Sequence, residues 1–596
     1  MKKIVFIFIF ISCTASWAQS KIEGFIYDGM SNEPLPYSTI RIYGTKTHYT
    51  ITNEDGKFAV DSIFSKDSLE VRHLGFRTKK TTLSHFEKTS KLNMEMDIAV
   101  LDEVVLTAGE DTEYPYKLLG RVIDKYRKGK HATLSKAFLT MNSSARNIPI
   151  EHLEGFYNSA QNLAHGILEL NVKSGRFGQN SSFPFFSLDN TKVLTDFQLF
   201  GTSKQILPDH PGNLTDNAIE RKYDVKIKDC TACRQGDISI SFSPKVPNGR
   251  LFYGEMLVDP ELLIIKKIAL WATNPITNAL TSINKDVDLT PKEIKLNIVF
   301  NPMDLEVVQY LDLSFQMDYR SKNVLEIIDS RTFLYFYDFN TLFEDPYFTK
   351  TIPFNNDYDQ MIALQTSDDF WKINYQFPKS ISENESMEFM KKNGFLINFN
   401  NYISLDNLKY AKPAVLSWQH GRRLNWVHLH DLATEENTSD AMGYTPGKNI
   451  TTGKAYDTPF QQLQNTTAKN IKDKINICYM VDSHTGENGI QKIVSRTLLD
   501  IDSSRFSYER TKNKLAYLNI IFDIYEVYRQ LATSRITVDM TFDVAKSIYD
   551  EMYKAASTEV KKMEKETRQG NDYNGLVEWN NRIKSKLKID NLAMVK

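Results

Sequence analysis

The sequence predicts a multidomain α+β protein, and three changes of pattern along the chain support this class. Short alternating segments divided by turn residues fill residues 20–107, which is typical of a small β-sandwich. Longer strand-like runs dominate residues 108–395 and predict a β-rich domain. Helical spacing of apolar residues returns near the C-terminus, so residues 396–596 are expected to form an α+β domain.

Length and charge limit the possible organisation and partners. The chain has 596 residues, too many for one hydrophobic core, so about three or four folded units are expected. We place their boundaries at 1–18 for a signal peptide, then 19–107, 108–395 and 396–596. The 73 Lys and Arg residues balance the 74 Asp and Glu residues, so no basic excess indicates a nucleic-acid partner.

The N-terminus has the pattern of a secretory signal peptide. Two lysines precede the apolar run Ile4–Ile11, which is too short to span a bilayer. Ser16 and Ala18 place small residues at the cleavage positions, which predicts a mature start at Gln19. A lipoprotein cysteine at Cys13 is the alternative, although the residues before it fit a lipobox poorly. The signal pattern predicts an exported protein, periplasmic, outer-membrane associated or secreted. No other run is long enough for a membrane helix.

The first domain is expected to contain about seven short strands. Asn53–Gly56, for example, has the composition of a tight turn between two of them. Several motifs follow one another in a recognisable order: Gly24 with Tyr27–Asp28, Glu33–Tyr37, Thr52–Phe58, His73–Phe76 and Leu101–Val105. With these motifs the segment resembles the carboxypeptidase regulatory-like domain, a transthyretin-like sandwich. The resemblance implies an accessory domain without catalytic residues. His73 is expected to pack or form a hydrogen bond at a strand end.

The middle domain is expected to hold one or two large antiparallel sheets and a few helices. Apolar residues from Leu119 to Tyr126 recur at helical spacing after a polar linker. Strands are expected over residues 166–172, 223–228, 237–242, 254–259, 262–270, 293–300, 311–319 and 332–337. The run Gly254–Glu261 is similar to a strand–turn–strand of envelope proteins that carry a curved sheet, which implies an envelope setting and no reaction.

Cys230 and Cys233 form a C-x-x-C motif at the expected tip of a hairpin. In an exported protein such a pair can be a redox centre or a local disulfide. A thioredoxin-type pair opens a helix, whereas strands are expected on both sides here, and zinc would need further ligands nearby. We therefore expect a structural disulfide, which leaves Cys478 as a buried thiol.

The last domain is organised around an expected helix at Lys514–Arg529. Leu515, Leu518, Phe522 and Tyr525 recur at helical spacing and give it an apolar face, so core packing is its expected role. Two more helices are expected over residues 542–566 and 573–587.

The same helix carries the motif Phe522–Asp523–Ile524, with Glu526 and Arg529 behind it. This motif resembles that of secreted zinc-dependent peptidases of the bacterial envelope, in which H-E-x-x-H (the head) is followed by F-D-I, an acidic residue and an Arg (the tail). In the head, the two His residues bind zinc and the Glu acts as general base. Here the head positions are Tyr517, Leu518 and Ile521, which cannot supply this chemistry.

A second landmark of those peptidases is E-T-x-H-G followed by a Trp. This chain has Glu566–Gly570 and then Trp579, with Gln569 at the His position. The resemblance therefore implies a zincin-like fold in which the zinc ligands and the base have been lost together, that is, a pseudo-peptidase domain without a cofactor.

Two functional hypotheses follow. The first is a non-catalytic exported envelope protein that acts as a binding or scaffolding module for an unknown envelope protein or polymer. The second is a metal-dependent hydrolase or peptidase with a relocated site. His428 and His430 share one face if they lie on a strand, and His484 is the only later His. A metal site of this kind needs more ligands than the sequence brings together, so the first hypothesis is preferred.

Overall fold

The computed structural model describes residues 21–594 in several stretches. The residues it leaves undescribed within that range are 45–46, 62–66, 98–112, 184–189, 203–205, 229–235, 277–286, 302–303, 322–323, 353, 355–356, 365–367, 398–413, 427–473, 487–488 and 506–509. The signal peptide, the linker, both residues of the C-x-x-C motif and two of the candidate histidines, His428 and His430, lie outside the described residues.

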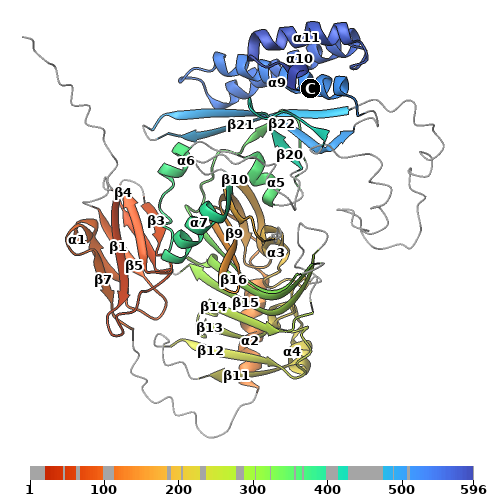
Figure 1. The fold of residues 1–596 in the computed structure, drawn as a ribbon. Coiled ribbons are helices and arrows are strands. Elements are labelled where there is room, and N and C mark those ends of the chain that lie inside the picture. Colours follow the sequence, from red (N-terminus) through yellow and green to blue (C-terminus); the bar gives the residue numbers. More distant parts are fainter. Residues whose placement is uncertain are drawn as a thin grey trace, which may run out of the picture.

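The N-terminal unit is a β-sandwich of seven short strands (Figure 1), as the alternation predicted. Its sheets have the orders β4-β1-β7 and β3-β2-β5-β6. The elements are β1 (Lys21–Asp28), β2 (Thr39–Tyr43), β3 (Thr47–Ile51), β4 (Lys57–Asp61), β5 (Ser68–Arg72), β6 (Lys79–Thr82), α1 (Leu83–Thr89) and β7 (Lys91–Met94). Gly56 has φ +71° in the expected tight turn, a conformation that favours glycine.

The middle of the chain forms one antiparallel sheet of 11 strands, in the order β11-β12-β13-β14-β15-β16-β17-β8-β9-β10-β19. The strands are β8 (Thr133–Ala145), β9 (Ile148–Asn162), β10 (Gly166–Asn180), β11 (Tyr223–Lys228), β12 (Ile238–Pro244), β13 (Tyr253–Asp259), β14 (Ile264–Thr273), β15 (Asp288–Asn301), β16 (Asp304–Ser321), β17 (Val324–Tyr337) and β19 (Gly394–Ile397). The large antiparallel sheet was expected; β8, β9 and β19 were not.

The helices of the middle region lie against this sheet and at its ends. They are α2 (Tyr114–Arg127), α3 (Asn190–Asp196), α4 (Asp216–Lys222), α5 (Asp357–Ala363), α6 (Asp368–Ile373) and α7 (Ile381–Asn393). The expected apolar face of α2, from Leu119 to Tyr126, is buried in the main hydrophobic core.

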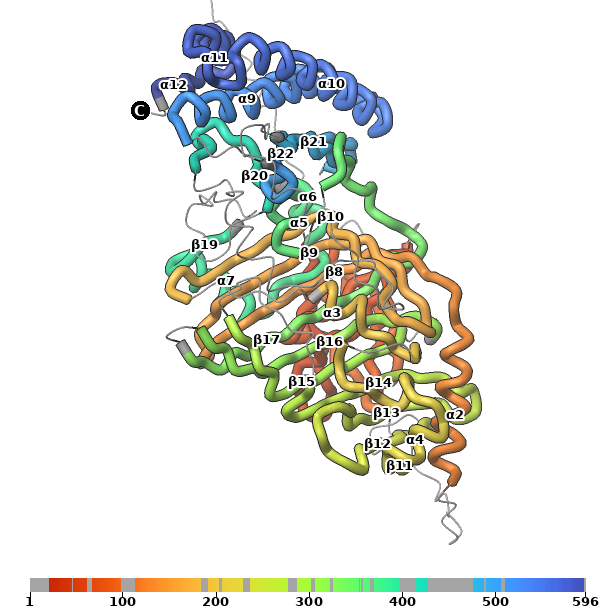
Figure 2. Tube along the Cα trace, turned by 90° about the vertical axis from the view of Figure 1, so that its right-hand side faces the viewer, coloured from red at the N-terminus to blue at the C-terminus, as the bar shows by residue number. Residues whose placement is uncertain are grey.

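The two faces of the large sheet have different partners. On β17, Leu334 and Phe336 belong to the core that contains α2, whereas the alternate residues Phe333 and Tyr335 pack with aromatic residues of the sandwich. Alternate residues of a strand point to opposite faces, so the sandwich covers the face opposite α2. Figure 2 views the sheet with the strands of the sandwich behind it.

The C-terminal unit combines a four-stranded sheet, β18-β21-β22-β20, with helices stacked on one side (Figure 1). Its elements are β18 (Tyr347–Phe348), β20 (Val415–Ser417), β21 (Lys474–Thr485), β22 (Gln491–Arg505), α9 (Lys512–Arg535), α10 (Phe542–Glu566), α11 (Tyr573–Leu587) and α12 (Asn591–Met594). The helices α10 and α11 have the predicted bounds, and α9 extends beyond the predicted helix at both ends. Within the described residues, no helix is both long and apolar enough to cross a membrane.

Candidate functional site

The head positions of the peptidase-like motif lie inside the hydrophobic core of the C-terminal unit. The helix α9 starts at Lys512 behind the N-cap Thr511, whose side chain accepts the backbone N–H of Lys514. Tyr517, Leu518 and Ile521 are all buried and belong to one apolar cluster with residues of β21, α10 and α11. Across the part of the chain that the structure describes, no three His, Cys, Asp or Glu residues are grouped as metal ligands would be.

The structure brings Gln569 next to the start of the same helix. Arg568, Gln569 and Gly570 all have positive φ in the turn between α10 and α11. A Cβ added at Gly570 would lie 3.0 Å from Cβ of Tyr517, so the turn packs closely on the helix. The backbone oxygen of Gln569 accepts a hydrogen bond from Lys514 Nζ at 3.1 Å. The two separated parts of the peptidase-like pattern therefore meet in space.

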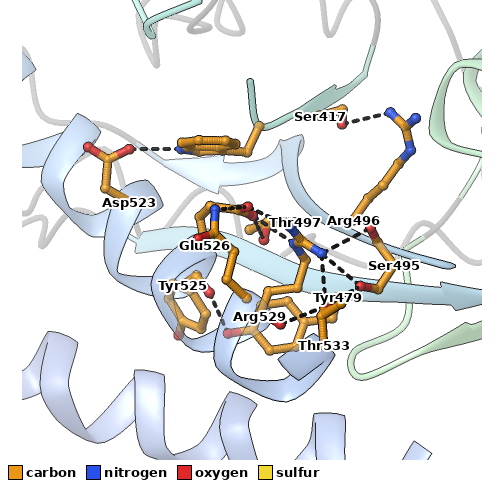
Figure 3. A network of polar contacts seen from close by, with 12 residues as sticks. Ser417, Tyr479, Ser495, Arg496, Thr497, Asp523, Tyr525, Glu526, Arg529 and Thr533 are labelled. Carbon is orange, nitrogen blue, oxygen red and sulfur yellow. Dashed lines mark hydrogen bonds and ion pairs between the residues drawn. The ribbon is translucent and has the colours of Figure 1, made fainter. Parts of the chain in front are cut away.

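The carboxylate of Asp523 is fully buried and holds three segments together. It accepts hydrogen bonds from Trp418 Nε1 at 2.8 Å, Arg423 Nη2 at 2.7 Å and Asn591 Nδ2 at 2.8 Å (Asp523 is labelled in Figure 3). Burial raises the pKa of Asp523, while Arg423 and the other donors oppose that rise. These donors come from the segment after β20 and from α12, so Asp523 ties both to α9.

Glu526 forms a second buried network one turn further along α9 (Figure 3). Its carboxylate accepts hydrogen bonds from Thr497 at 2.7 Å, from Arg529 at 2.8 and 2.6 Å, and from Gln530 at 3.0 Å. Arg529 also donates to Ser495 Oγ on β22 at 2.9 Å. Since the oxygens of both carboxylates are occupied by protein donors, this tail fixes the helix on the sheet.

The residues around Gln569 also form hydrogen bonds that hold the end of α10 in place. Trp579 Nε1 donates to the Glu566 carboxylate at 2.9 Å, which joins the end of α10 to α11. Thr567 is buried and its hydroxyl donates to the backbone oxygen of Met563 at 2.8 Å.

Of the three histidines proposed for a relocated metal site, only His484 lies among the described residues. It is buried near the end of β21, and its ring lies edge-on to Phe370 at 6.0 Å. Burial, followed by the charge of Lys173, lowers the pKa of His484 to about 4. Nearby, Lys173 of β10 forms an ion pair with Asp482 and donates to the backbone oxygen of Ser483 at 2.8 Å, so this neighbourhood joins two sheets.

Two other sequence predictions concern cysteine and histidine. Cys478 is a buried free thiol, as expected, and burial raises its pKa. His73 lies just past β5, and its Nδ1 is 3.0 Å from Ser38 Oγ, which agrees with the expected hydrogen bond at a strand end. The disulfide between Cys230 and Cys233 stays a prediction.

A cleft that the sequence did not indicate lies between the sandwich and the large sheet. Its volume is about 420 Å³. The sandwich contributes Tyr37, Thr39, Arg72, His73, Leu74, Gly75, Phe76, Thr78 and Asp97; the sheet side contributes Asp237, Leu257, Asp259, Leu262, Lys266, Lys267, Val299, Phe300, Gln309 and Tyr310. These two sets are far apart in the chain, so no local motif could have revealed the cleft.

Comparison with known proteins bears on the first unit. Residues 22–106 match the model of the CarboxypepD_reg-like domain, which confirms the expected regulatory-like domain. No curated protein matches the chain. Among solved structures, the complex of Pseudomonas aeruginosa MucA/MucB is similar over 37% of this chain and 93% of that chain, at 8% identity and a TM-score of 0.13. A similarity at that score supports no conclusion about fold or function.

Proposed function

We propose that this chain is a non-catalytic, exported protein of the cell envelope, in which a regulatory-like sandwich and a pseudo-peptidase domain serve as binding and scaffolding modules. The observation that carries the proposal is the burial of Tyr517, Leu518 and Ile521 in one apolar core. The aliphatic side chains of Leu518 and Ile521 offer neither a metal ligand nor a base, and the phenol of Tyr517 alone does not make a zinc site.

The zincin-like character of the C-terminal unit belongs to this proposal. Its support is the meeting of the Gln569 turn with α9 at Tyr517, in the order that the peptidase resemblance implies. The occupied carboxylates of Asp523 and Glu526 explain how the tail of the motif can persist without catalysis, because both hold the helix in place.

Export is supported by the sequence pattern alone: the lysines and apolar run before Ala18. N-terminal sequencing of the mature protein from envelope fractions tests it. A mature chain that begins at Gln19 is expected; one that begins at a lipidated Cys13 would replace cleavage after Ala18 by lipoprotein anchoring, and one that retains Met1 would contradict export.

The absence of catalysis is tested with purified full-length protein, zinc and a chelator. A ligand that binds only the folded state stabilises it by about 2.7 kcal/mol at 100 times its Kd. We expect no change in Tm on adding zinc or EDTA, and no cleavage of peptide substrates. Stoichiometric zinc, or chelator-sensitive cleavage, would instead favour the hydrolase that uses His428, His430 and His484.

A restored head provides the matched variant. Tyr517→His, Leu518→Glu and Ile521→His together place polar groups in an apolar core, which costs free energy unless partners are present. We expect this triple variant to have a lower Tm than the wild type and still no peptidase activity while Gln569 remains. Zinc-dependent activity in the variant would show that the head positions still face an open, functional site.

A further inference from the structure

Direct contacts join the sandwich to the large sheet beside the cleft. Tyr37 of the sandwich stacks on Phe333 of β17, with ring centroids 4.2 Å apart. Arg331 donates to the Tyr37 hydroxyl at 2.7 Å and to both oxygens of Asp312, at 2.8 and 3.0 Å, and also pairs with Glu54. Largely preformed, concave sites of this size are typical of small-ligand binding.

Apolar side chains from both the sandwich and the large sheet line the cleft. Leu74 of the sandwich is 40% exposed and Leu262, between β13 and β14, is 61% exposed. Phe76, Leu257 and Val299 continue this apolar surface among the lining residues. A ligand that enters between them would gain free energy by burying an apolar chain or ring.

The carboxylates that line the cleft already have partners. Asp237 pairs with Lys266 at 2.6 Å, and Asp97 pairs with Arg77 at 3.5 Å. Asp259 Oδ1 accepts the backbone N–H groups of Glu261 and Leu262, at 3.0 and 2.9 Å. The acidic side of the cleft therefore gives a cationic ligand little to bind.

Lys267 differs from these groups. It lines the cleft and is half-buried, and no carboxylate among the described residues lies within ion-pair distance of its ammonium group. Its charge helps burial to lower the pKa of His73, and it opposes the rise in the pKa of Asp312 that burial causes. Gln309, only 2% exposed, also lines the cleft; its Nε2 donates to the backbone oxygen of Phe336 at 2.9 Å, while its Oε1 has no donor within the described structure.

We propose that this cleft binds a small amphipathic carboxylate. The carboxylate pairs with Lys267, and the apolar body lies between Leu74 and Leu262. A water-sized group takes about 30 Å³, so the cleft has room for a ligand of about a dozen non-hydrogen atoms. This inference rests on the proposed function, since it names the class of ligand that a non-catalytic binding module would hold.

The test is isothermal titration calorimetry of full-length protein with decanoate, below its micelle concentration, at pH 7.5. Decanol and acetate are the comparison probes, because each keeps one half of the ligand. We expect decanoate to bind at one site and more tightly than either probe. No binding of decanoate, or equal affinity for decanol, would overturn the proposal.

Variants assign the binding to the cleft. Lys267→Gln is expected to weaken decanoate binding at least tenfold, whereas Lys267→Arg retains it and Lys295→Gln, an exposed lysine on β15 outside the cleft, leaves it unchanged. Leu262→Ser should weaken decanoate without altering the fold, because Leu262 is already largely exposed. Equal affinities for Lys267→Gln and Lys295→Gln would contradict a role for Lys267.

The outcome separates the two proposals. A protein that neither binds decanoate nor hydrolyses peptides would lose only the ligand class proposed for the cleft. Chelator-sensitive hydrolysis would contradict the non-catalytic function itself, whatever decanoate does.

Discussion

The polar network on α9 and the cleft beside the sandwich use charged groups in opposite ways. Asp523 has no exposed surface, and three side-chain donors fill its oxygens. Lys267 sits in a cleft of about 420 Å³ with no ion-pair partner among the described residues. A saturated buried charge holds a fold together, because losing one partner leaves the other charge uncompensated. A half-buried lysine that has no ion-pair partner among the described residues is available to a ligand.

The largest effect is expected for Asp523→Ala. It leaves Arg423 buried opposite an empty space, and breaking a buried pair in this way typically costs about 3–5 kcal/mol. Urea unfolding measures this loss, with the exposed Asp543→Ala as a control that stays within about 1 kcal/mol. Lys267→Gln should change stability by less than about 0.5 kcal/mol. Equal losses for Asp523→Ala and Lys267→Gln would remove the distinction between the two regions.

Next in size are the substitutions in the apolar core around α9. Leu518→Ala and Ile521→Ala each remove buried methyl and methylene groups, which typically costs about 2–5 kcal/mol. Leu531→Ala on the same helix is the control, because Leu531 is exposed. If all three variants melted like the wild type, the head positions would not be packed as a core.

A smaller, pH-dependent effect is expected in the cleft. Burial, followed by the charge of Lys267, lowers the pKa of His73 from 6.5 to about 4. The unfolded chain therefore binds a proton between pH 6.5 and 4 that the folded chain does not, so stability falls as the pH decreases through this range. At pH 5 this effect of His73 lowers the free energy of unfolding by about 1–2 kcal/mol relative to neutral pH.

His73→Gln isolates this contribution. Glutamine can still form a hydrogen bond with Ser38 but cannot titrate. Between pH 7.5 and 5, the free energy of unfolding of the variant should therefore fall by about 1–2 kcal/mol less than that of the wild type. Urea unfolding at both pH values gives the difference, and the exposed His131→Gln serves as the control. Parallel pH profiles for wild type and His73→Gln would show that His73 is not held neutral in the cleft.

Local signals determined much of the fold. Apolar spacing predicted the bounds of α10 and α11, whose first turns are capped by the side chains of Thr541 and Asp572. Alternation predicted the sandwich and most strands of the large sheet. It failed for β9, where residues on both faces are buried from Ile150 to Asn162, so polar and apolar residues do not alternate.

What the sequence by itself determined is the sandwich, most strands of the large sheet and the helices α10 and α11, because the periodicity of side chains along an element is a local property. What only the tertiary structure decided is which distant polar groups satisfy one another. Asp523 meets Arg423 and Asn591, and Arg331 meets Tyr37, across separations that no spacing rule reaches. The cleft arises in the same way, because its walls come from two units whose docking depends on side-chain contacts between sheet and sandwich.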